Sequence, residues 1–329
     1  MSLARATVPL AGAPALPPGP PFAAEALLDW VGVEFDLPPR DPRLRGLNAG
    51  GREPVAALAN LAGYVDGWAE YADYVDTLEP SSPVHDKKML ERALTLHRWR
   101  ALGGLGGVEA SKPLRVLDIG CGVGRFARWF LDLGHDVTLV DGDLRSLRHA
   151  VWHCAGAPGR LDVHWTTAED LPPVDEIGRY DIVVMAEILN YVERPADVVA
   201  AVAERLTEDG VVLFSVEARY GWALATDVAP GLAEGFFDGV AHRAGDRYVR
   251  CYSDLDLETL FAGFDVRLQR SHYVLSGPFE LAVGADIAHG GGRGDPEALA
   301  QLLAWEERFE AHPVSRELNR AWVGVAKPK

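Results

Sequence analysis

The chain has 329 residues, of which 48% are hydrophobic and 24% charged, and its formal net charge is −16 at pH 7. This composition is typical of soluble globular proteins and excludes a disordered chain, and no apolar run reaches the roughly 18 residues of a membrane-spanning helix. The negative charge repels phosphate groups, so we expect neither a nucleic-acid partner nor a membrane partner.

The positions of the cysteines and prolines indicate whether the protein has disulfides, a zinc site or a secretory signal. Cys121, Cys154 and Cys251 are far apart, with no CxxC pair or Cys/His cluster, so neither a disulfide scaffold nor a structural zinc site is expected. Repeated prolines interrupt residues 1–22, which have no sustained apolar stretch and are interpreted as an extended tail rather than a secretory signal. We expect a cytoplasmic protein without a bound metal.

Helical patterns dominate the segment up to residue 105. In 53–78, aromatic residues that include Tyr71 recur at helical spacing, so this helix either packs as a core face or covers a ligand. A second helix is predicted over 83–101, ended by a glycine pair. Because His97 shares a face of this helix with two leucines, we predict a buried histidine there.

From residue 114, short apolar runs alternate with helical patterns. Each apolar run is continuous, which is typical of parallel strands covered on both faces. The predicted strands cover 114–120, 136–143, 161–170 with its turn, 180–187 and 211–217, and the predicted helices cover 124–134, 144–156 and 195–210. Asp143 is suited to cap the second of these helices.

The remainder is less regular, with no clear period in 218–250. A helix followed by a strand is predicted over 254–275, a further helix over 295–312 and a last strand over 319–328. The two late strands fit an antiparallel hairpin at one edge of the sheet. The predicted fold is therefore α/β: a doubly wound, mostly parallel seven-stranded sheet with an antiparallel edge hairpin, plus an N-terminal helical segment.

The strongest motif is the glycine-rich turn LDIGCGVGRF at 117–126, which joins a buried strand to a helix. Gly120 and Gly122 let the backbone bend and approach a ligand closely, and the start of the helix presents free N–H groups. A dinucleotide fingerprint, GxGxxG, needs its third glycine where this chain has Arg125, whereas the third glycine here is Gly124.

Two carboxylates narrow the class of ligand. Asp118 lies at the end of the first strand, where it would repel a diphosphate and could pair with an ammonium group. Asp141 ends the second strand about twenty residues beyond the loop, a place from which an acidic side chain can accept hydrogen bonds from both ribose hydroxyls. The implied ligand therefore has a ribose and a cationic amino-acid end.

Taken in order, these motifs resemble the class I S-adenosylmethionine-dependent methyltransferases that act on small molecules. LDIGCGVGRF looks like the first motif of that family, and VDGD looks like the acidic end of its second strand. AEDLP at 168–172 is similar to the stretch near the adenine, AEILNYV at 186–192 to the turn after the fourth strand, and EDGVVLFSVE to the fifth strand. The resemblance covers roughly 114–217 and the late hairpin, and leaves 1–105 and 218–252 without a motif.

This resemblance implies S-adenosylmethionine as the cofactor, with S-adenosylhomocysteine as product. The glycines would shape the site of the methionyl part, Asp118 would hold its amino group, Asp141 the ribose, and Glu169 or Asp170 the adenine amino group. The implied cofactor-binding residues are Tyr71, Asp118, Gly120, Cys121, Gly122, Gly124, Asp141, Gly142, Leu144, Glu169, Asp170 and Ala186. A purely structural interpretation stays open for each, such as a plain turn at Asp141 or a surface acid at Asp170.

The resemblance also implies a division of the chain into five parts. These are the tail (1–22), an N-terminal helical cap (23–105), a Rossmann-like cofactor-binding core (106–217), a lid or substrate insertion (218–252) and the C-terminal part of the sheet with an inserted helix (253–329).

Methyl transfer from a sulfonium is an in-line displacement in which the cofactor supplies the reactivity, so no single residue marks the active site. Related small-molecule O-methyltransferases often place a histidine where this chain has Tyr191. Because a phenol ordinarily ionises near pH ~10, Tyr191 is interpreted as an acceptor contact or a packing residue rather than a base. Glu187 could favour the sulfonium, hold an acceptor amine or cap the turn. His242, in the irregular segment, is a candidate base or an exposed histidine.

We therefore expect a methyltransferase that modifies a small molecule, a specialised metabolite being one such acceptor, at oxygen, nitrogen or carbon. Three alternatives stay open. The bound sulfonium could promote decarboxylation or cyclisation without transfer, the chain could bind the cofactor without turnover, or it could be a nicotinamide reductase. A homodimer through the N-terminal helices is a further hypothesis. The acceptor, the methylated atom, the base and the oligomeric state stay open.

Overall fold

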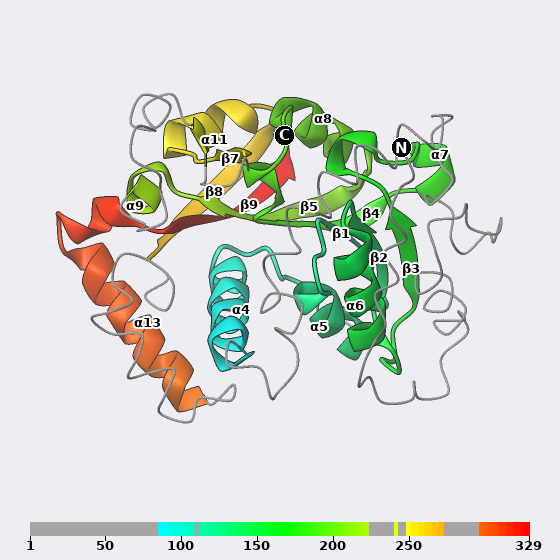
Figure 1. Ribbon diagram of the computed structural model, residues 1–329, viewed down its shortest axis with the longest axis horizontal. Helices are drawn as coiled ribbons and strands as arrows, with labels where there is room; N and C mark the ends of the chain where they lie inside the picture. Colours follow the sequence, from blue (N-terminus) through cyan, green and yellow to red (C-terminus); the bar gives the residue numbers. More distant parts are fainter. Residues whose placement is uncertain (1–84, 109–111, 224–239, 243–247, 273–295) are drawn as a thin grey trace, which may run out of the picture. The chain divides into compact units, whose positions relative to one another are not determined.

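The computed structural model describes residues 85–108, 112–223, 240–242, 248–272 and 296–329. Within these residues, seven strands form one mixed sheet in the order β3-β2-β1-β4-β5-β9-β8, and β6 and β7 form a separate pair (Figure 1). The strands β1, β2 and β3 pair in parallel, whereas β9 is antiparallel to both β5 and β8. The predicted mostly parallel sheet with an antiparallel edge is confirmed. The predicted helix over 53–78 lies outside the described residues.

The chain divides into two compact units, each with more contacts inside it than to the other. The first unit consists of Met1–Asp76 and Val108–Ile182, and the second of Thr77–Gly107 and Val183–Lys329. The described elements that begin in the first unit are β1 (Arg115–Ile119), α5 (Arg125–Asp132), β2 (Asp136–Asp141), α6 (Leu144–Cys154), β3 (Leu161–Trp165), η2 (Ala168–Asp170), α7 (Val174–Ile177) and β4 (Tyr180–Ala186). The helices α5 and α6 pack against each other and against β2.

The interior of the first unit is built from uniformly apolar strands. Every residue of β1 after Arg115 is buried, and so are the four central residues of β2. The face of α5 that meets these strands is apolar, with Phe126, Ala127, Phe130 and Leu131 buried. Strands covered on both faces need this continuous apolar sequence, so the predicted strand–helix alternation is confirmed here.

Asp143 directly precedes α6 and caps it, as the sequence predicts. Its Oδ2 atom accepts hydrogen bonds from the Ser146 backbone N–H at 3.2 Å and from the Ser146 hydroxyl at 2.5 Å. These bonds satisfy one of the helix donors that lack a partner within the helix. The side chain is buried, so the cap also fixes where the chain leaves β2.

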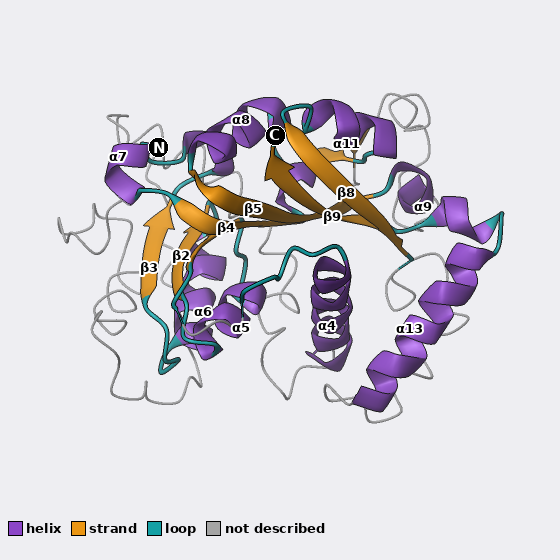
Figure 2. Cartoon of the chain, turned by 180° about the vertical axis from the view of Figure 1, so that it is seen from behind, coloured by secondary structure: helices purple, strands orange, loops and turns teal. Residues whose placement is uncertain are grey.

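The second unit contains the remaining described elements. They are α4 (His85–Ala101), η3 (Ile188–Asn190), α8 (Pro195–Glu204), β5 (Leu206–Glu217), α9 (Arg219–Ala223), β6 (Val240–His242), β7 (Tyr248–Arg250), α11 (Asp254–Leu260), β8 (Phe264–Ser271), α13 (Pro296–Ala311), η4 (Ser315–Leu318) and β9 (Ala321–Pro328). The helices α8 and α11 lie on one side of β5, β9 and β8, and α4 and α13 lie on the other (Figure 2).

The core of this unit is organised around Phe214 in the middle of β5. Its partner across the ladder is Gly324 of β9, where an added Cβ would collide with the Phe214 ring. The ring stacks on Phe261 with 4.5 Å between centroids. From the opposite side of the sheet, the Trp99 indole N–H of α4 donates to the Phe214 carbonyl at 3.1 Å. These contacts bind α4 and the end of α11 to the antiparallel strands.

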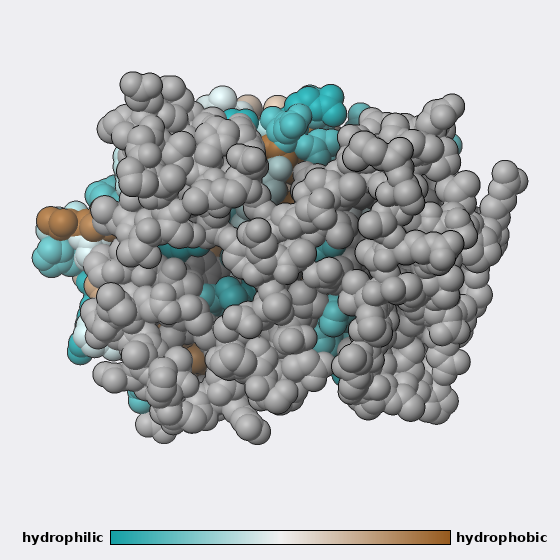
Figure 3. All heavy atoms as spheres, viewed as in Figure 1, coloured by the Kyte–Doolittle hydropathy of each residue, from teal (hydrophilic) through white to brown (hydrophobic). Residues whose placement is uncertain are grey.

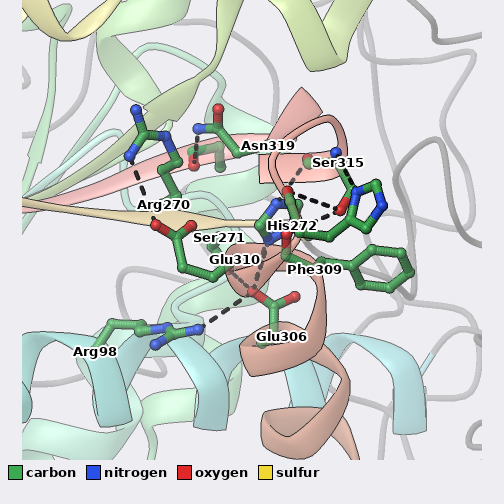
Figure 4. Close-up of polar contacts among 11 residues, drawn as sticks. Arg98, Arg270, Ser271, His272, Glu306, Phe309, Glu310, Ser315 and Asn319 are labelled. Atoms are coloured by element: carbon green, nitrogen blue, oxygen red, sulfur yellow. Dashed lines mark hydrogen bonds and ion pairs between the residues drawn. The ribbon is translucent and has the colours of Figure 1, made fainter. Parts of the chain in front are cut away.

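A buried ionic network ties α4, β8 and α13 together (Figure 4). The Glu306 side chain is fully buried, and its Oε2 atom accepts from the His272 backbone N–H at 2.8 Å, the Ser271 hydroxyl at 3.2 Å and Arg98 Nη2 at 3.4 Å. His272 is held in turn by the Ser315 carbonyl, 3.1 Å from Nε2. Burial alone raises the pKa of Glu306, but the His272 hydrogen bonds and the Arg98 charge outweigh it and hold this pKa below its ordinary value.

Two details of the predicted elements are wrong. The helix predicted over 195–210 ends at Glu204, and β5 begins at Leu206 rather than at residue 211. The Arg205 N–H bonds back to Val202 at 2.9 Å and its guanidinium to the Ala201 carbonyl at 2.6 Å, which closes the helix before Gly210. The irregular segment over 218–250 contains α9 and the β6–β7 pair.

The predicted burial of His97 is also wrong, because His97 is exposed. Leu90, Leu94 and Arg98, spaced by four residues, are among the buried positions of α4, and the others are Met89, Glu91, Thr95, Leu96 and Trp99. Arg98 occupies a buried position because Glu306 supplies a buried partner for its charge. A hydrophobic pattern cannot reveal a buried position that is taken by a paired cation.

No helix within the described ranges is both long and apolar enough to cross a membrane. In the view of Figure 3, the described atoms at the top, over α8 and the end of β9, are mainly hydrophilic. Glu204 of α8, Lys327 of β9 and Lys329, which directly follows β9, are exposed.

Candidate cofactor and acceptor site

The glycine-rich turn between β1 and α5 bends as its sequence predicts, through glycines with positive φ angles. Gly120, Gly122 and Gly124 have φ angles of 68°, 53° and 83°, in the left-handed region that only glycine adopts at little cost. The N–H groups of Gly120 and Cys121 both bond to the Val140 carbonyl, at 2.7 and 3.1 Å, so the turn is pinned to the end of β2.

Asp141, at the end of β2, holds the turn from the other side. Its Oδ2 atom accepts from the Gly122 N–H at 2.7 Å, and its Oδ1 atom from the Asp143 N–H at 2.8 Å. Desolvation and the charge of Asp143 raise the pKa of Asp141 to about 7, although the backbone N–H bonds oppose this rise. The carboxylate is therefore more than a plain turn residue, since it shapes the glycine loop.

Asp118 lies on the same face of the sheet as Asp141. Asp118 pairs with Leu139 in the ladder, and Asp141 follows Leu139 by two residues, so both side chains leave the sheet in one direction. Asp118 is 2% exposed, and within the described residues its Oδ2 atom has no hydrogen-bond partner.

The surroundings of Asp118 favour a cationic ligand. Burial and the charge of Asp141 raise the pKa of Asp118 to about 7, while an N–H bond from Ala127 and the charge of Arg125 oppose the rise. A buried carboxylate oxygen without a partner is costly unless a donor or cation meets it. These two carboxylates, as hydrogen-bond acceptors, fit a ligand with an ammonium group beside a hydroxylated sugar.

The turn after β3 carries the two acids that the sequence assigns to the adenine. Asp170 is fixed through Thr167, whose hydroxyl donates to Asp170 Oδ2 at 3.1 Å, and its own carbonyl accepts from the Thr166 hydroxyl at 2.9 Å. Glu169 is half-buried beside it. The Trp165 indole N–H donates to the Gly142 carbonyl at 3.1 Å, which ties this turn to the end of β2.

Two further predicted cofactor residues lie at the same end of β1 and β2. Cys121 is buried, and burial with the charges of Asp141 and Asp118 raises the pKa of its thiol well above the ordinary value. Leu144 is the first residue of α6. All three cysteines are buried and none forms a disulfide, so Cys121 contributes packing rather than a reactive thiolate.

The candidate acceptor residues follow β4 and belong to the second unit. Among the described residues other than glycine, Glu187 alone has a positive φ, 65°. Its N–H donates to the Ser215 carbonyl of β5 at 2.8 Å, and the turn then continues through Asn190 and Tyr191. Asn190 is fully buried and accepts from the Glu217 N–H at 3.0 Å. Ala186, the last residue of β4, precedes this strained turn.

Arg320 joins this turn and was not predicted from the sequence. Its guanidinium forms an ion pair with buried Glu217, at the end of β5. Burial lowers the pKa of Arg320, and electrostatic interactions with Glu187, Tyr191 and Glu91 oppose that shift. An arginine directly before an apolar strand gives no signal of such a role, because its partners are far away in the sequence.

Two predicted residues cannot be placed fully. Tyr71 lies outside the described residues, and of His242 only the backbone in β6 is described. The glycine loop and its acids belong to the first unit, whereas Glu187, Tyr191 and His242 belong to the second.

Comparison with known proteins identifies the family of the chain. A family model described as "Methyltransferase domain" matches residues 70–268, more than half of the chain. The chain belongs to this methyltransferase family. The relatives include "Ubiquinone biosynthesis O-methyltransferase" of Aromatoleum aromaticum, 37% identical over 31% of this chain and 43% of its own, and that of Thiobacillus denitrificans, 34% identical over 33% and 47%.

The chain matches less than half the length of each of those two relatives. Similar solved structures include the "DhpI-SAH complex structure". It is 16% identical in sequence, the match covers 83% of this chain and 96% of that chain, and the TM-score is 0.48. Another is the PH0226 protein of Pyrococcus horikoshii OT3, with 15% identity, 80% and 99% covered and a TM-score of 0.49.

Proposed function

We propose that this chain binds S-adenosylmethionine and transfers its methyl group to an oxygen, nitrogen or carbon atom of a small molecule. The observation that carries the proposal is the buried Asp118 carboxylate, whose Oδ2 atom lacks a partner within the described residues and lies on the face of Asp141. Membership of the methyltransferase family supports it.

We assign the cofactor site residue by residue. Asp118 would accept from the amino group, the loop of Gly120, Cys121, Gly122 and Gly124 would enclose the methionyl chain, and Asp141 would accept from the ribose hydroxyls. The adenine would lie between Leu144 and the turn of Glu169 and Asp170, beside Gly142. Ala186 and Tyr71 complete the proposed set.

The bound cofactor supplies an electrophilic methyl group on sulfur. The chain contributes position and exclusion of water, and an acceptor atom has to be held about 3–3.5 Å from the methyl carbon for the displacement to proceed. We assign this holding role to Glu187 and Tyr191, which share a turn with the buried Asn190. His242 stays the proposed base for an acceptor that starts protonated.

The test is calorimetric titration with S-adenosylmethionine, S-adenosylhomocysteine and NAD. We expect micromolar binding of the two sulfur ligands and none of NAD. Asp118→Asn, which keeps the shape and removes the charge, should weaken both sulfur ligands, whereas Asp175→Asn, at an exposed position of α7, should not. The absence of a binding signal with both sulfur ligands, or binding of NAD instead, would contradict the proposal.

Methyl transfer itself needs a separate measurement. Incubation with S-adenosylmethionine carrying a labelled methyl group and a panel of phenols, amines and carboxylic acids should give a labelled small-molecule product. Cofactor binding without any labelled product, but with a decarboxylated or cyclised one, would favour a reaction without methyl transfer.

Light scattering would test the proposed homodimer. A monomer at all accessible concentrations would exclude it.

A further inference from the structure

One face of α6 lies directly behind the glycine loop. Gly124 approaches this face so closely that an added Cβ would lie 3.1 Å from the Ala150 Cα atom and 3.3 Å from the Cys154 Sγ atom. Ala150, His153 and Cys154 are spaced by three and four residues, so they share that face. The helix therefore forms the rear wall of the loop.

His153 makes a directed polar contact with the loop from this wall. Its Nδ1 atom lies 3.1 Å from the Val123 carbonyl oxygen. Because a carbonyl oxygen only accepts, Nδ1 has to carry the proton, whichever state Nε2 has. Val123 is 2% exposed and lies between Gly122 and Gly124, so this bond fixes the centre of the strained turn.

Arg128 of α5 makes hydrogen bonds both to the loop and to α6. The Arg128 N–H bonds to the Gly124 carbonyl at 2.9 Å, and its Nη1 atom donates to the His153 carbonyl at 2.5 Å. Its Nε atom is held by Asp132 at 2.8 Å. The loop is thus bonded to α5, α5 to α6, and α6 back to the loop.

We propose that His153 is a positioning residue for the cofactor loop, acting by donating from Nδ1 to the Val123 carbonyl. The inference rests on the proposed function, because its consequence is the affinity of the loop for the methionyl part of the ligand. Without the bond, Val123 can turn its buried carbonyl, and the N–H groups of the loop lose the orientation that binding requires.

The test exploits the two nitrogens of histidine. The amide nitrogen of asparagine is bonded to Cγ, as Nδ1 is, so His153→Asn keeps a donor at the right place. Glutamine places its nitrogen one atom farther out, so His153→Gln moves the donor away. His149→Gln removes an imidazole from the preceding turn of α6 and serves as control. Each variant is titrated with S-adenosylhomocysteine, and its melting temperature is measured without ligand.

We expect His153→Gln to raise the Kd of S-adenosylhomocysteine about five-fold, the typical effect of one lost hydrogen bond. His153→Asn should stay within about two-fold of the native Kd because it keeps the donor, and histidine and asparagine have similar helix propensities, so the helix itself is not weakened. His149→Gln should also stay within about two-fold because it leaves the bond from His153 in place. Native affinity in His153→Gln, or an equal loss in His153→Asn, would overturn the inference alone. A native chain that binds neither sulfur ligand would overturn the proposed function as well.

Discussion

Asp118 and Asp141 leave paired strands on the same face of the sheet, and the charge of Asp141 adds to the burial that raises the pKa of Asp118 to about 7. Two acids in such surroundings are costly to ionise together unless a positive charge joins them. Ionising Asp118 therefore costs the folded chain stability, and the ammonium group of the proposed ligand would offset this cost.

Replacing Asp118 by asparagine should separate stability from binding. The pKa of Asp118 is higher in the folded chain than its ordinary 3.8, so the native chain loses stability as the pH rises through about 7. At pH 8 without ligand, Asp118→Asn should therefore melt higher than the native chain. With S-adenosylmethionine it should gain less, because losing a charged hydrogen bond weakens affinity by roughly 10- to 100-fold. Thermal melts with and without ligand measure both effects, and a lower ligand-free melting temperature would contradict this account.

Binding of S-adenosylmethionine should release protons near neutral pH. The groups facing the pair are Asp143, Arg125 and Cys121, and the Cys121 thiol stays neutral because its pKa is raised. The ammonium group prefers the ionised acids, so affinity should fall as the pH drops below about 7, by up to about tenfold per pH unit for one proton.

Calorimetry in phosphate and in Tris checks this proton release, because the two buffers have different heats of ionisation. Equal apparent heats in both buffers, with an affinity that is flat between pH 6 and 8, would rule it out. Asp118→Asn provides the control, since it should remove the larger part of the buffer dependence.

Gly124→Ala should damage the loop through strain and packing together. The residue has φ 83°, a conformation that costs an L-residue roughly 1–2 kcal/mol, and its Cβ would press on Ala150. We expect urea unfolding to show a loss of about 2 kcal/mol or more, with weaker binding of S-adenosylhomocysteine. Gly107→Ala, which also has positive φ but open space around its Cβ, isolates the contribution of strain. Equal losses in both variants would exclude a packing contribution.

Glu187 should show strain of its own. Its φ of 65° is unfavourable for any side chain, so Glu187→Gly should be more stable than Glu187→Ala by about 1 kcal/mol. Both variants lack the carboxylate, so their difference reports the backbone alone. Urea unfolding measures it, and equal stabilities would show that the turn relaxes when the side chain is removed.

Glu306→Gln should destabilise the second unit, because it leaves the cation Arg98 buried beside a neutral amide. Breaking a buried ion pair costs about 3–5 kcal/mol. The pKa of Glu306 is lowered in the folded chain, so the stabilisation is present above its ordinary value of 4.5 and is lost as the pH falls through the folded value. The difference from the native chain should therefore shrink toward pH 3, as measured by urea unfolding at several pH values. A constant difference would show that shape, rather than charge, is responsible.

The parts of the fold that could be predicted are those with local causes. The glycine loop, the cap at Asp143 and the uniformly apolar β1 and β2 follow from backbone sterics and burial, which short sequence patterns record. Asp118 and Asp141 could be placed because parallel strands bring their carboxyl ends to one edge.

What could not be predicted depends on partners distant in sequence. Arg98 is buried only because Glu306, 208 residues later, meets it, and so His97 faces solvent instead. Arg320 and Glu217 form their pair across two antiparallel strands. His153 carries no motif, and its contact with Val123 exists only once α6 packs behind the loop.

The position of β9 between β5 and β8 sets an order for the growth of the sheet. β9 lies between β5 and β8 in the sheet but comes after both of them, and after α13, in the chain. During synthesis, β5 and β8 are therefore made before the strand that joins them. Until then the central residues of β5, Phe214 among them, face an open edge. A nascent chain that ends between residues 272 and 321 therefore leaves the facing edges of β5 and β8 unpaired, and unpaired strand edges favour aggregation.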